Sequence, residues 1–336
     1  MRDNSSATTI FRPVIPSRSA PGLWWGLLGV AAFSFTVPFT RVAVGGLSPL
    51  FIGAGRAVVA AILAASALAL TRQRLPRGRQ WARLALVAAG IVVGFPLLTS
   101  YALTTAPASH GAVVIALLPA ATATAAVLRG REHPSVAFWL VTAVGAAAAM
   151  AFALAQSGNP LQSGGFGQTG WADVLLLGAV GAAAIGYAEG GLLARELGAW
   201  QTVSWALVLA LPLMAALTTL SMTQHPPAAS AVQWAAFAYL GVVSMFFGFF
   251  AWYRGLAIGP MAKVSQIQLV QPVLSICWAG LLLGESLDWT TAIGGLAVIV
   301  CAGAAVRVRL QPEPAQQNRR ESPERRDHQP PQPAAR

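Results

Sequence analysis

Long stretches without any charged residue are the feature that most constrains how this chain can fold. No Asp, Glu, Lys or Arg occurs between Arg83 and Arg129, and none occurs between Glu196 and Arg254. Each stretch can hold two spans of about 20 residues, the length of helix that crosses the hydrocarbon core of a bilayer. A soluble protein of this size would need a polar surface, yet only 10% of the residues are charged. We therefore expect an integral membrane protein surrounded by a lipid bilayer.

The apolar segments predict an all-α fold with ten transmembrane helices. An open sheet would leave backbone groups unpaired in lipid, so helices are the expected element. The predicted spans are 22–44, 48–70, 84–104, 110–129, 136–155, 171–193, 199–220, 232–254, 264–283 and 288–306. No apolar core precedes residue 22, so the first span is expected to be a retained helix and not a cleaved signal peptide.

The arginines between the spans predict the orientation in the membrane. Five of them lie within residues 71–83, Arg83 included, and basic loops stay on the cytoplasmic side. Segment 1–21 and the tail 307–336 then both lie in the cytoplasm, and the composition of the tail is typical of disorder. Because the arginines lie in loops and tails, the net charge of +11 does not indicate nucleic-acid binding.

Residues 101–132 and 253–285 repeat one pattern. Each begins with a tyrosine, continues as an apolar helix containing a proline, and ends with a glutamate that follows the proline by 13 residues. Because each half holds five spans, an odd number, the repeat 171–306 is expected to be inverted relative to the repeat 22–155. That arrangement is typical of secondary transporters, in which two halves rock about a central site.

The same two stretches resemble a known family. YALTTAPASHGAVVIALLPAATATAAVLRGRE and YRGLAIGPMAKVSQIQLVQPVLSICWAGLLLGE are similar to the end of the EamA repeat, which defines the ten-helix drug/metabolite transporter (DMT) superfamily. Residues 281–285, Leu-Leu-Leu-Gly-Glu, match more specifically than Gly-Arg-Glu at 130–132. The resemblance implies transport of a small solute, often export of amino acids or metabolites driven by an ion gradient or by exchange, and implies no particular substrate.

The ninth span carries the most polar helix face. At about 100° per residue, one face collects Ser265, Gln268, Gln271, Pro272 and Ser275. These amides and hydroxyls are candidate substrate-binding groups that would line a solute path. Alternatively they hydrogen-bond neighbouring helices, at about 0.6–2 kcal/mol each.

Three tyrosines are further candidates for facing the cavity: Tyr101, Tyr187 and Tyr253. Aromatic residues near span ends more commonly form the belt at the membrane interface. Pro119 and Pro272 are candidate hinges, because proline removes a backbone hydrogen bond and kinks a helix. The first repeat offers only Pro119 and Thr122 on the matching face, so the two halves are not chemically equivalent.

Two charged residues lie within predicted spans. Arg56 lies about eight residues into the second span, where it could bind a substrate carboxylate or extend to the outer interface. Glu189 could carry a coupling proton, or it could pair with Arg195 or Arg254. Three further ionisable residues are expected to be anchors at span boundaries: His110, Asp173 and Lys263.

The function predicted from these features is secondary transport, with export of a small polar or amphipathic metabolite across the inner membrane by alternating access. A proton or a counter-solute is the expected coupling partner. An importer or exchanger of the same fold stays an alternative, as does a membrane-embedded enzyme or sensor. No catalytic residue, metal site or cofactor is expected, since the common catalytic motifs are missing and Cys277 and Cys301 lie in apolar runs. The oligomeric state stays open, a homodimer included.

Overall fold

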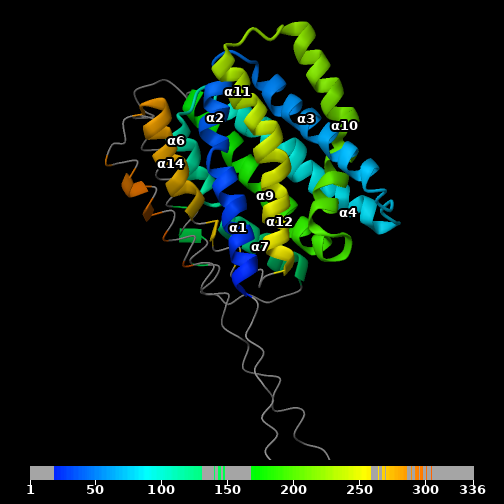
Figure 1. Ribbon diagram of the computed structural model, residues 1–336. Helices are drawn as coiled ribbons and strands as arrows, with labels where there is room; N and C mark the ends of the chain where they lie inside the picture. Colours follow the sequence, from blue (N-terminus) through cyan, green and yellow to red (C-terminus); the bar gives the residue numbers. More distant parts are fainter. Residues whose placement is uncertain are drawn as a thin grey trace, which may run out of the picture.

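The computed structural model describes residues 19–130, 168–258, 264, 267–268 and 270–285, with isolated positions in 140–147 and 289–304. Most of the predicted spans 136–155 and 288–306, most of segment 1–21 and all of the tail 307–336 lie outside the described residues. The elements form a helical bundle, and no strand occurs among the described residues (Figure 1). In chain order they are α1 (Ser19–Ser34), α2 (Thr36–Ala43), α3 (Pro49–Leu70), α4 (Arg79–Val87), η1 (Ala88–Gly94), α5 (Phe95–Ala102), α6 (Ala108–Ile115), α7 (Leu118–Gly130), α9 (Gln168–Leu197), α10 (Ala199–Gln224), α11 (Ala231–Tyr239), η2 (Leu240–Gly248), α12 (Phe249–Ile258) and α14 (Val270–Leu283).

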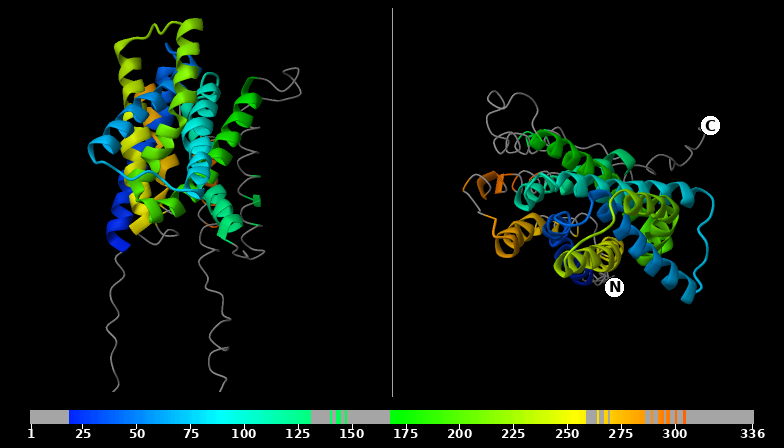
Figure 2. Two further views of the ribbon diagram at one scale, coloured as in Figure 1. Left: turned by 90° about the vertical axis from the view of Figure 1, so that its right-hand side faces the viewer. Right: turned by 90° about the horizontal axis from the view of Figure 1, so that it is seen from above.

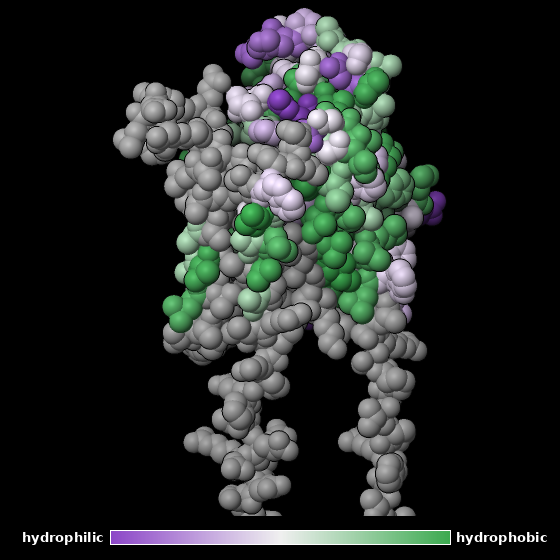
Figure 3. Space-filling model, turned by 90° about the vertical axis from the view of Figure 1, so that its left-hand side faces the viewer, coloured by the Kyte–Doolittle hydropathy of each residue, from purple (hydrophilic) through white to green (hydrophobic). Residues whose placement is uncertain are grey.

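Six segments among the described residues are long and apolar enough to cross a membrane: Pro21–Ala43, Pro49–Leu70, Arg79–Ala102, Gly170–Leu197, Ala199–Gln224 and Ala231–Ile258. They coincide with six predicted spans, while the fourth and ninth correspond to the shorter apolar helices Ala108–Thr122 and Val270–Leu283. Hydrophobic side chains cover much of the middle of the face in Figure 3, and hydrophilic ones gather at its top. The all-helical membrane class is thus confirmed, whereas the count of ten stays a prediction.

The bundle has two ends, and each is marked by a connection between helices. The α10–α11 connection, residues 225–230, lies at the top of Figure 1, and the α3–α4 connection, residues 71–78, lies lower on the right. We call these the 225–230 end and the 71–78 end. The start of α3 belongs to the 225–230 end, because the Ser48 hydroxyl caps α3 and lies 2.6 Å from the Ser221 hydroxyl of α10. Helices α3 and α10 pack along each other between the two ends (Figure 2).

Prolines determine where three spans break. Helix α1 stops at Ser34, just before Pro38. Helix α6 stops at Ile115, just before Pro119, and a turn at Gln268 precedes Pro272. Proline cannot donate to the carbonyl four residues earlier, and its ring clashes with it, so each break lies where that clash would fall. Pro119 and Pro272 therefore stand at matching breaks in the two repeats, and their hinge motion stays a prediction.

A π-helix recurs at the same place in both halves. The third span contains η1 between α4 and α5, and the eighth contains η2 between α11 and α12. In both spans the preceding α-helix is nine residues long. Because π-helical turns are rare, their occurrence at matching places in two spans shows that the internal repeat extends to the backbone conformation. Such turns are also often found at functional sites.

Glycines bring helices of the two halves into close contact. A Cβ at Gly90 in η1 would lie 2.4 Å from the carbonyl oxygen of Ala182 in α9, and one at Gly255 in α12 would lie 2.8 Å from the amide nitrogen of Gly26 in α1. Small residues allow such backbone approach in membrane bundles. The third span thus packs on the sixth, and the eighth packs correspondingly on the first.

Candidate functional site

Buried polar atoms without hydrogen bonds occur at the start of α14. Gln268 is 2% exposed, and within the described part of the chain neither its amide oxygen nor its nitrogen makes a hydrogen bond. The Gln271 amide oxygen and the Trp252 indole nitrogen are likewise buried and unpaired there. An unsatisfied buried polar group costs about 1–3 kcal/mol, so this arrangement calls for an explanation.

An aromatic cluster from other spans lies beside the Gln268 amide. The Tyr187 hydroxyl of α9 interacts with the Gln268 side chain without meeting the geometry of a well-formed hydrogen bond. The Tyr187 ring lies 5.8 Å from the Trp252 ring of α12. Phe249 packs on Tyr187 at 5.9 Å and on Phe33 of α1 at 4.8 Å. We call Gln268, Gln271, Tyr187 and Trp252 the amide–aromatic site. It combines neutral hydrogen-bonding groups with flat apolar surfaces.

Tyr253 is next to this site but has a partner. Its hydroxyl donates to the Gly186 carbonyl at 3.0 Å. The approach depends on Gly190, where a Cβ would lie 2.2 Å from the Tyr253 hydroxyl. Tyr253 therefore joins α12 to α9 and supports the wall that Tyr187 forms.

Ser275 shows how a proline break is satisfied by another helix. Pro38 has no N–H to donate to the Ser34 carbonyl, which α1 therefore leaves without its helical partner. The Ser275 hydroxyl donates to that carbonyl at 2.7 Å, and the Trp278 indole donates to the Ser34 hydroxyl at 3.1 Å. Ser275 thus ties the first span to the ninth.

The other predicted substrate-binding residues lie apart from the amide–aromatic site or outside the description. Arg56 of α3 is 2% exposed and donates to the Thr99 hydroxyl at 3.4 Å, while its Nε atom has no partner in the described part of the chain. The guanidinium is therefore enclosed by protein and does not extend to the interface. Tyr101, at the end of α5, is 43% exposed. Ser265 lies outside the described residues.

Glu189 pairs with an arginine that the sequence did not indicate. The Arg83 side chain of α4 donates to Glu189 and, through a second nitrogen, to Glu196. Glu189 is buried and Glu196 is half exposed. The ion partner is thus Arg83 rather than Arg195 or Arg254, and it ties the third span to the sixth at the 71–78 end.

A buried contact between two ionisable side chains was missed in the sequence. His110 of α6 and Asp173 of α9 are both buried, with 2.5 Å between Nε2 and Oδ1. They were expected to be separate interfacial anchors, but the structure brings them together inside the bundle. The available signal was weak: each is an ionisable group at the start of an apolar span, and in the predicted topology both spans start on the same side.

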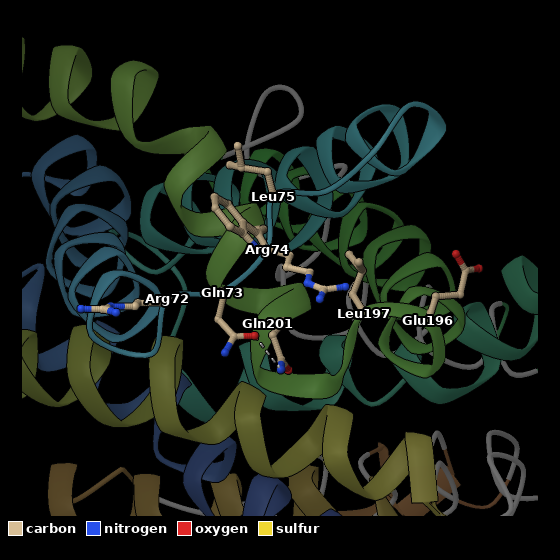
Figure 4. Close-up of a pocket in the computed structure, with 8 residues that line it drawn as sticks. Arg72, Gln73, Arg74, Leu75, Glu196, Leu197 and Gln201 are labelled. Carbon is tan, nitrogen blue, oxygen red and sulfur yellow. Dashed lines mark hydrogen bonds between the residues drawn. The ribbon is translucent and has the colours of Figure 1, made fainter.

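Two cavities lie at opposite ends of the bundle. The one at the 71–78 end has a volume of about 400 Å³, and in it the Gln201 amide donates to Gln73 at 3.3 Å (Figure 4). Arg72 and Arg74, which also line it, point in different directions in this view. The cavity at the 225–230 end has a volume of about 430 Å³ and is lined by Arg41, Val44, Gly45, Thr104, Leu283 and Glu285. No residue of the amide–aromatic site lines either cavity.

The bundle, its recurring π-helices and its buried polar site define a multi-pass membrane protein built from two repeats. The chain belongs to the EamA-like transporter family, whose model matches residues 20–154 and 170–306. It is 42% identical over 282 residues to the "Uncharacterized transporter YdeK" of Bacillus subtilis (strain 168), a match that covers 84% of this chain and 96% of that protein. The fold is also similar to that of a solved crystal structure, with a TM-score of 0.59 and 19% sequence identity. The match covers 87% of this chain and 99% of the chain in that structure. At that identity the likeness shows the fold alone.

Proposed function

We propose that this protein is a secondary transporter that exports a small polar or amphipathic metabolite across the inner membrane by alternating access. The family and the Bacillus subtilis relative support transport. The direction, the class of solute and the mechanism are inferences from the site and the sequence. The single observation that supports the solute site is the buried Gln268 amide, whose two polar atoms make no well-formed hydrogen bond among the described residues although the Tyr187 hydroxyl is nearby.

The chemistry of the amide–aromatic site limits the solute. An amide offers both hydrogen-bond donors and an acceptor, and the Trp252 indole adds a donor without a partner in the described part. The Tyr187 and Trp252 rings provide apolar faces. A solute with neutral donors and acceptors and one flat or apolar side would satisfy the amides and cover the rings. Charged groups would have to be recognised elsewhere.

Polar contacts join the two repeats at both ends, as alternating access requires. At the 225–230 end, the Glu285 carboxylate accepts hydrogen bonds from the Ala108 and Ser109 amides at 2.8 and 2.9 Å. At the 71–78 end, Arg83 pairs with Glu189. In the proposal one set of contacts is released while the other holds, so that the site opens to one side at a time. The five arginines at residues 72–83 support a cytoplasmic position for the 71–78 end, because basic loops stay on that side of the membrane.

The test separates solute binding from helix packing, the alternative role for these side chains. Gln268→Met removes two unpaired polar atoms and Trp252→Phe removes one, and each keeps most of the side-chain volume. If the atoms serve the solute, both variants lose export while the folded state becomes equally or more stable, because a buried unsatisfied group costs stability. If the atoms hold helices together, stability falls as well.

Export is measured by untargeted profiling of culture medium with and without overexpression, and stability by unfolding of the purified protein. Gln224→Leu, at an exposed position of α10, is the matched control. Unchanged export by a Gln268→Met/Gln271→Met double variant would refute the proposed site. Accumulation in the cells instead of the medium would favour the importer.

The proposed coupling group is Glu189, whose protonation would weaken its pair with Arg83. Glu189→Gln should abolish transport driven by a pH gradient in liposomes and leave exchange of solute for solute intact. Equal gradient-driven transport by wild type and variant would remove Glu189 from the mechanism and leave a counter-solute as the coupling partner.

A further inference from the structure

We infer that the buried guanidinium of Arg56 is a binding site for a halide ion, with chloride as the ion available in the cell. Arg56 lies about seven residues after Pro49, where α3 begins, which is about 10 Å along the helix axis. That depth is well inside a hydrocarbon core about 30 Å thick. The inference goes beyond the proposed function, which assigns no role to Arg56.

Arg56 carries a charge that the described residues do not balance. An arginine stays protonated in proteins, and this one is 2% exposed. Its one hydrogen bond among the described residues runs from Nη2 to the Thr99 hydroxyl at 3.4 Å, which is long for an N–H···O contact. The Nε atom is buried and has no partner there. Thr99 donates its own hydroxyl hydrogen to the Phe95 carbonyl at 2.7 Å, so this neutral residue supplies no counter-charge.

The acidic residues in the described part of the chain are all engaged elsewhere. Arg83 binds two of them, His110 contacts a third, and backbone amides of α6 bind the fourth; they are Glu189, Glu196, Asp173 and Glu285 in that order. No ion pair in that part of the chain includes Arg56. Because a buried charge without a counter-charge is strongly destabilising, we expect the counter-charge to be an anion taken up from solution.

Close helix packing around this part of α3 restricts the anion to a small one. A Cβ at Gly53 of α3 would lie 3.0 Å from the Cα atom of Leu97 in α5, and one at Gly241 of η2 would lie 3.1 Å from the Val59 side chain of α3. Both α5 and η2 therefore approach α3 within one turn of Arg56. A monatomic ion needs the least space, and its single charge neutralises one guanidinium, whereas a divalent oxyanion would replace one unpaired charge by another.

A halide also suits the unused N–H groups of the guanidinium. The group has five N–H donors in a planar fork, and the contact with Thr99 uses one of them. A spherical acceptor can take hydrogen bonds from the Nε–H and a neighbouring Nη–H at once, and hydrogen bonds to an ionised acceptor are the stronger kind. The bound ion would therefore satisfy both the charge and the unpaired Nε atom.

The experiment measures the thermal unfolding midpoint of the full-length protein in dodecyl maltoside micelles, with sodium chloride exchanged for sodium gluconate at constant ionic strength. An ion that binds only the folded state stabilises it by mass action. We expect a saturable rise of at least about 2 °C with chloride, the same rise with bromide, and none with gluconate, which is too large to enter. Broadening of the chloride NMR signal on addition of protein measures the binding directly.

Arg56→Met removes the charge and keeps a long, unbranched side chain. Its midpoint should not respond to chloride, and it should not broaden the chloride signal. In gluconate it should be at least as stable as wild type, because replacing an unpaired buried charge by an apolar side chain removes its cost. Arg56→Lys keeps the positive charge and should keep a chloride response. Arg254→Gln, at the arginine whose guanidinium lies 5.0 Å from the Trp25 ring, is the matched control and should respond as wild type does.

Equal midpoints of wild type in chloride and gluconate, or a chloride response that persists in folded Arg56→Met, would overturn the inference. Equal stabilisation by acetate, lost in Arg56→Met, would also overturn it, because a site that accepts a carboxylate is not restricted to a halide. Greater stability of wild type than of Arg56→Met in gluconate would show that Arg56 has its counter-charge within the protein and would overturn it as well. None of these outcomes bears on export through the amide–aromatic site, which is measured separately.

Discussion

Replacement of Ser275 by alanine tests whether a proline break in one repeat is completed by a hydroxyl from the other. The substitution removes the only described donor to the Ser34 carbonyl, which Pro38 cannot satisfy. Both serines are 1% exposed, so water is not expected to replace the lost bond. An unsatisfied buried carbonyl costs about 1–3 kcal/mol, and hydrogen bonds within membranes contribute about 0.6 kcal/mol on average and up to about 1.7. We therefore expect Ser275→Ala to lower the free energy of unfolding by about 1–2 kcal/mol.

The decisive measurement repeats this substitution in a Pro38→Ala background. Alanine restores an N–H at residue 38 that can donate to the Ser34 carbonyl, so loss of the Ser275 hydroxyl should then cost less than about 0.5 kcal/mol. The four proteins are unfolded by titration with SDS in mixed micelles and followed by tryptophan fluorescence. The difference between the two costs is the coupling free energy, which we expect to be about 1 kcal/mol.

Ser244→Ala provides the matched control for this cycle. The Ser244 hydroxyl is buried and lies 2.7 Å from the Thr36 hydroxyl, close to the same break, but it does not contact the Ser34 carbonyl. Its cost should be the same in the wild-type and Pro38→Ala backgrounds, within about 0.5 kcal/mol. If Ser275→Ala costs the same in both backgrounds, the freed carbonyl does not explain the contact between the first and ninth spans.

Two further predictions concern contacts between the third and sixth spans. Arg83→Gln should destabilise the protein by about 1–3 kcal/mol, because Glu189 is buried but the Arg83 side chain is 26% exposed. Glu189→Gln should recover part of this loss, whereas Glu196→Gln, at a half-exposed residue, should not. Unfolding titrations of the single and double variants measure this, and equal rescue by both would be inconsistent with it. Gly90→Ala should lower the thermal unfolding midpoint strongly, because its Cβ would meet backbone atoms of α9. Gly181→Ala is the control: no atom lies within 4 Å of its Cβ, so it should leave the midpoint unchanged or raise it. Similar midpoints for the two variants would contradict the close packing.

Local properties of the sequence predicted the elements but not the contacts between them. Charge-free segments indicated the membrane spans, since lipid excludes charge and water is absent there to satisfy backbone groups. Pro119 and Pro272 indicated the breaks, because the missing N–H acts within four residues. Both signals lie within one span, so no knowledge of neighbouring helices is needed to interpret them.

The charged contacts could not be derived in this way. Glu189 has Arg195 close by in the sequence, yet the structure pairs it with Arg83, which is 106 residues away. His110 and Asp173 are 63 residues apart. Which residues meet depends on how the spans pack, and this depends on close glycine contacts whose partners cannot be read from one sequence. The amide face of the ninth span was visible, but the aromatic rings opposite it come from other spans.

The two repeats share a scaffold but differ at the positions that form the amide–aromatic site. If the repeats are aligned on Pro119 and Pro272, Gln268 corresponds to Ile115 and Gln271 corresponds to Leu118. Ile115 and Leu118 are buried in the hydrophobic core. Each unpaired amide costs about 1–3 kcal/mol when no solute is bound, so a second copy of the pair would roughly double a cost that is already a large part of a typical stability of about 5–15 kcal/mol. Confining the amides to one repeat leaves the other free to pack as an apolar wall. In the proposed function, the solute would then be held against the second repeat instead of on the axis between the two.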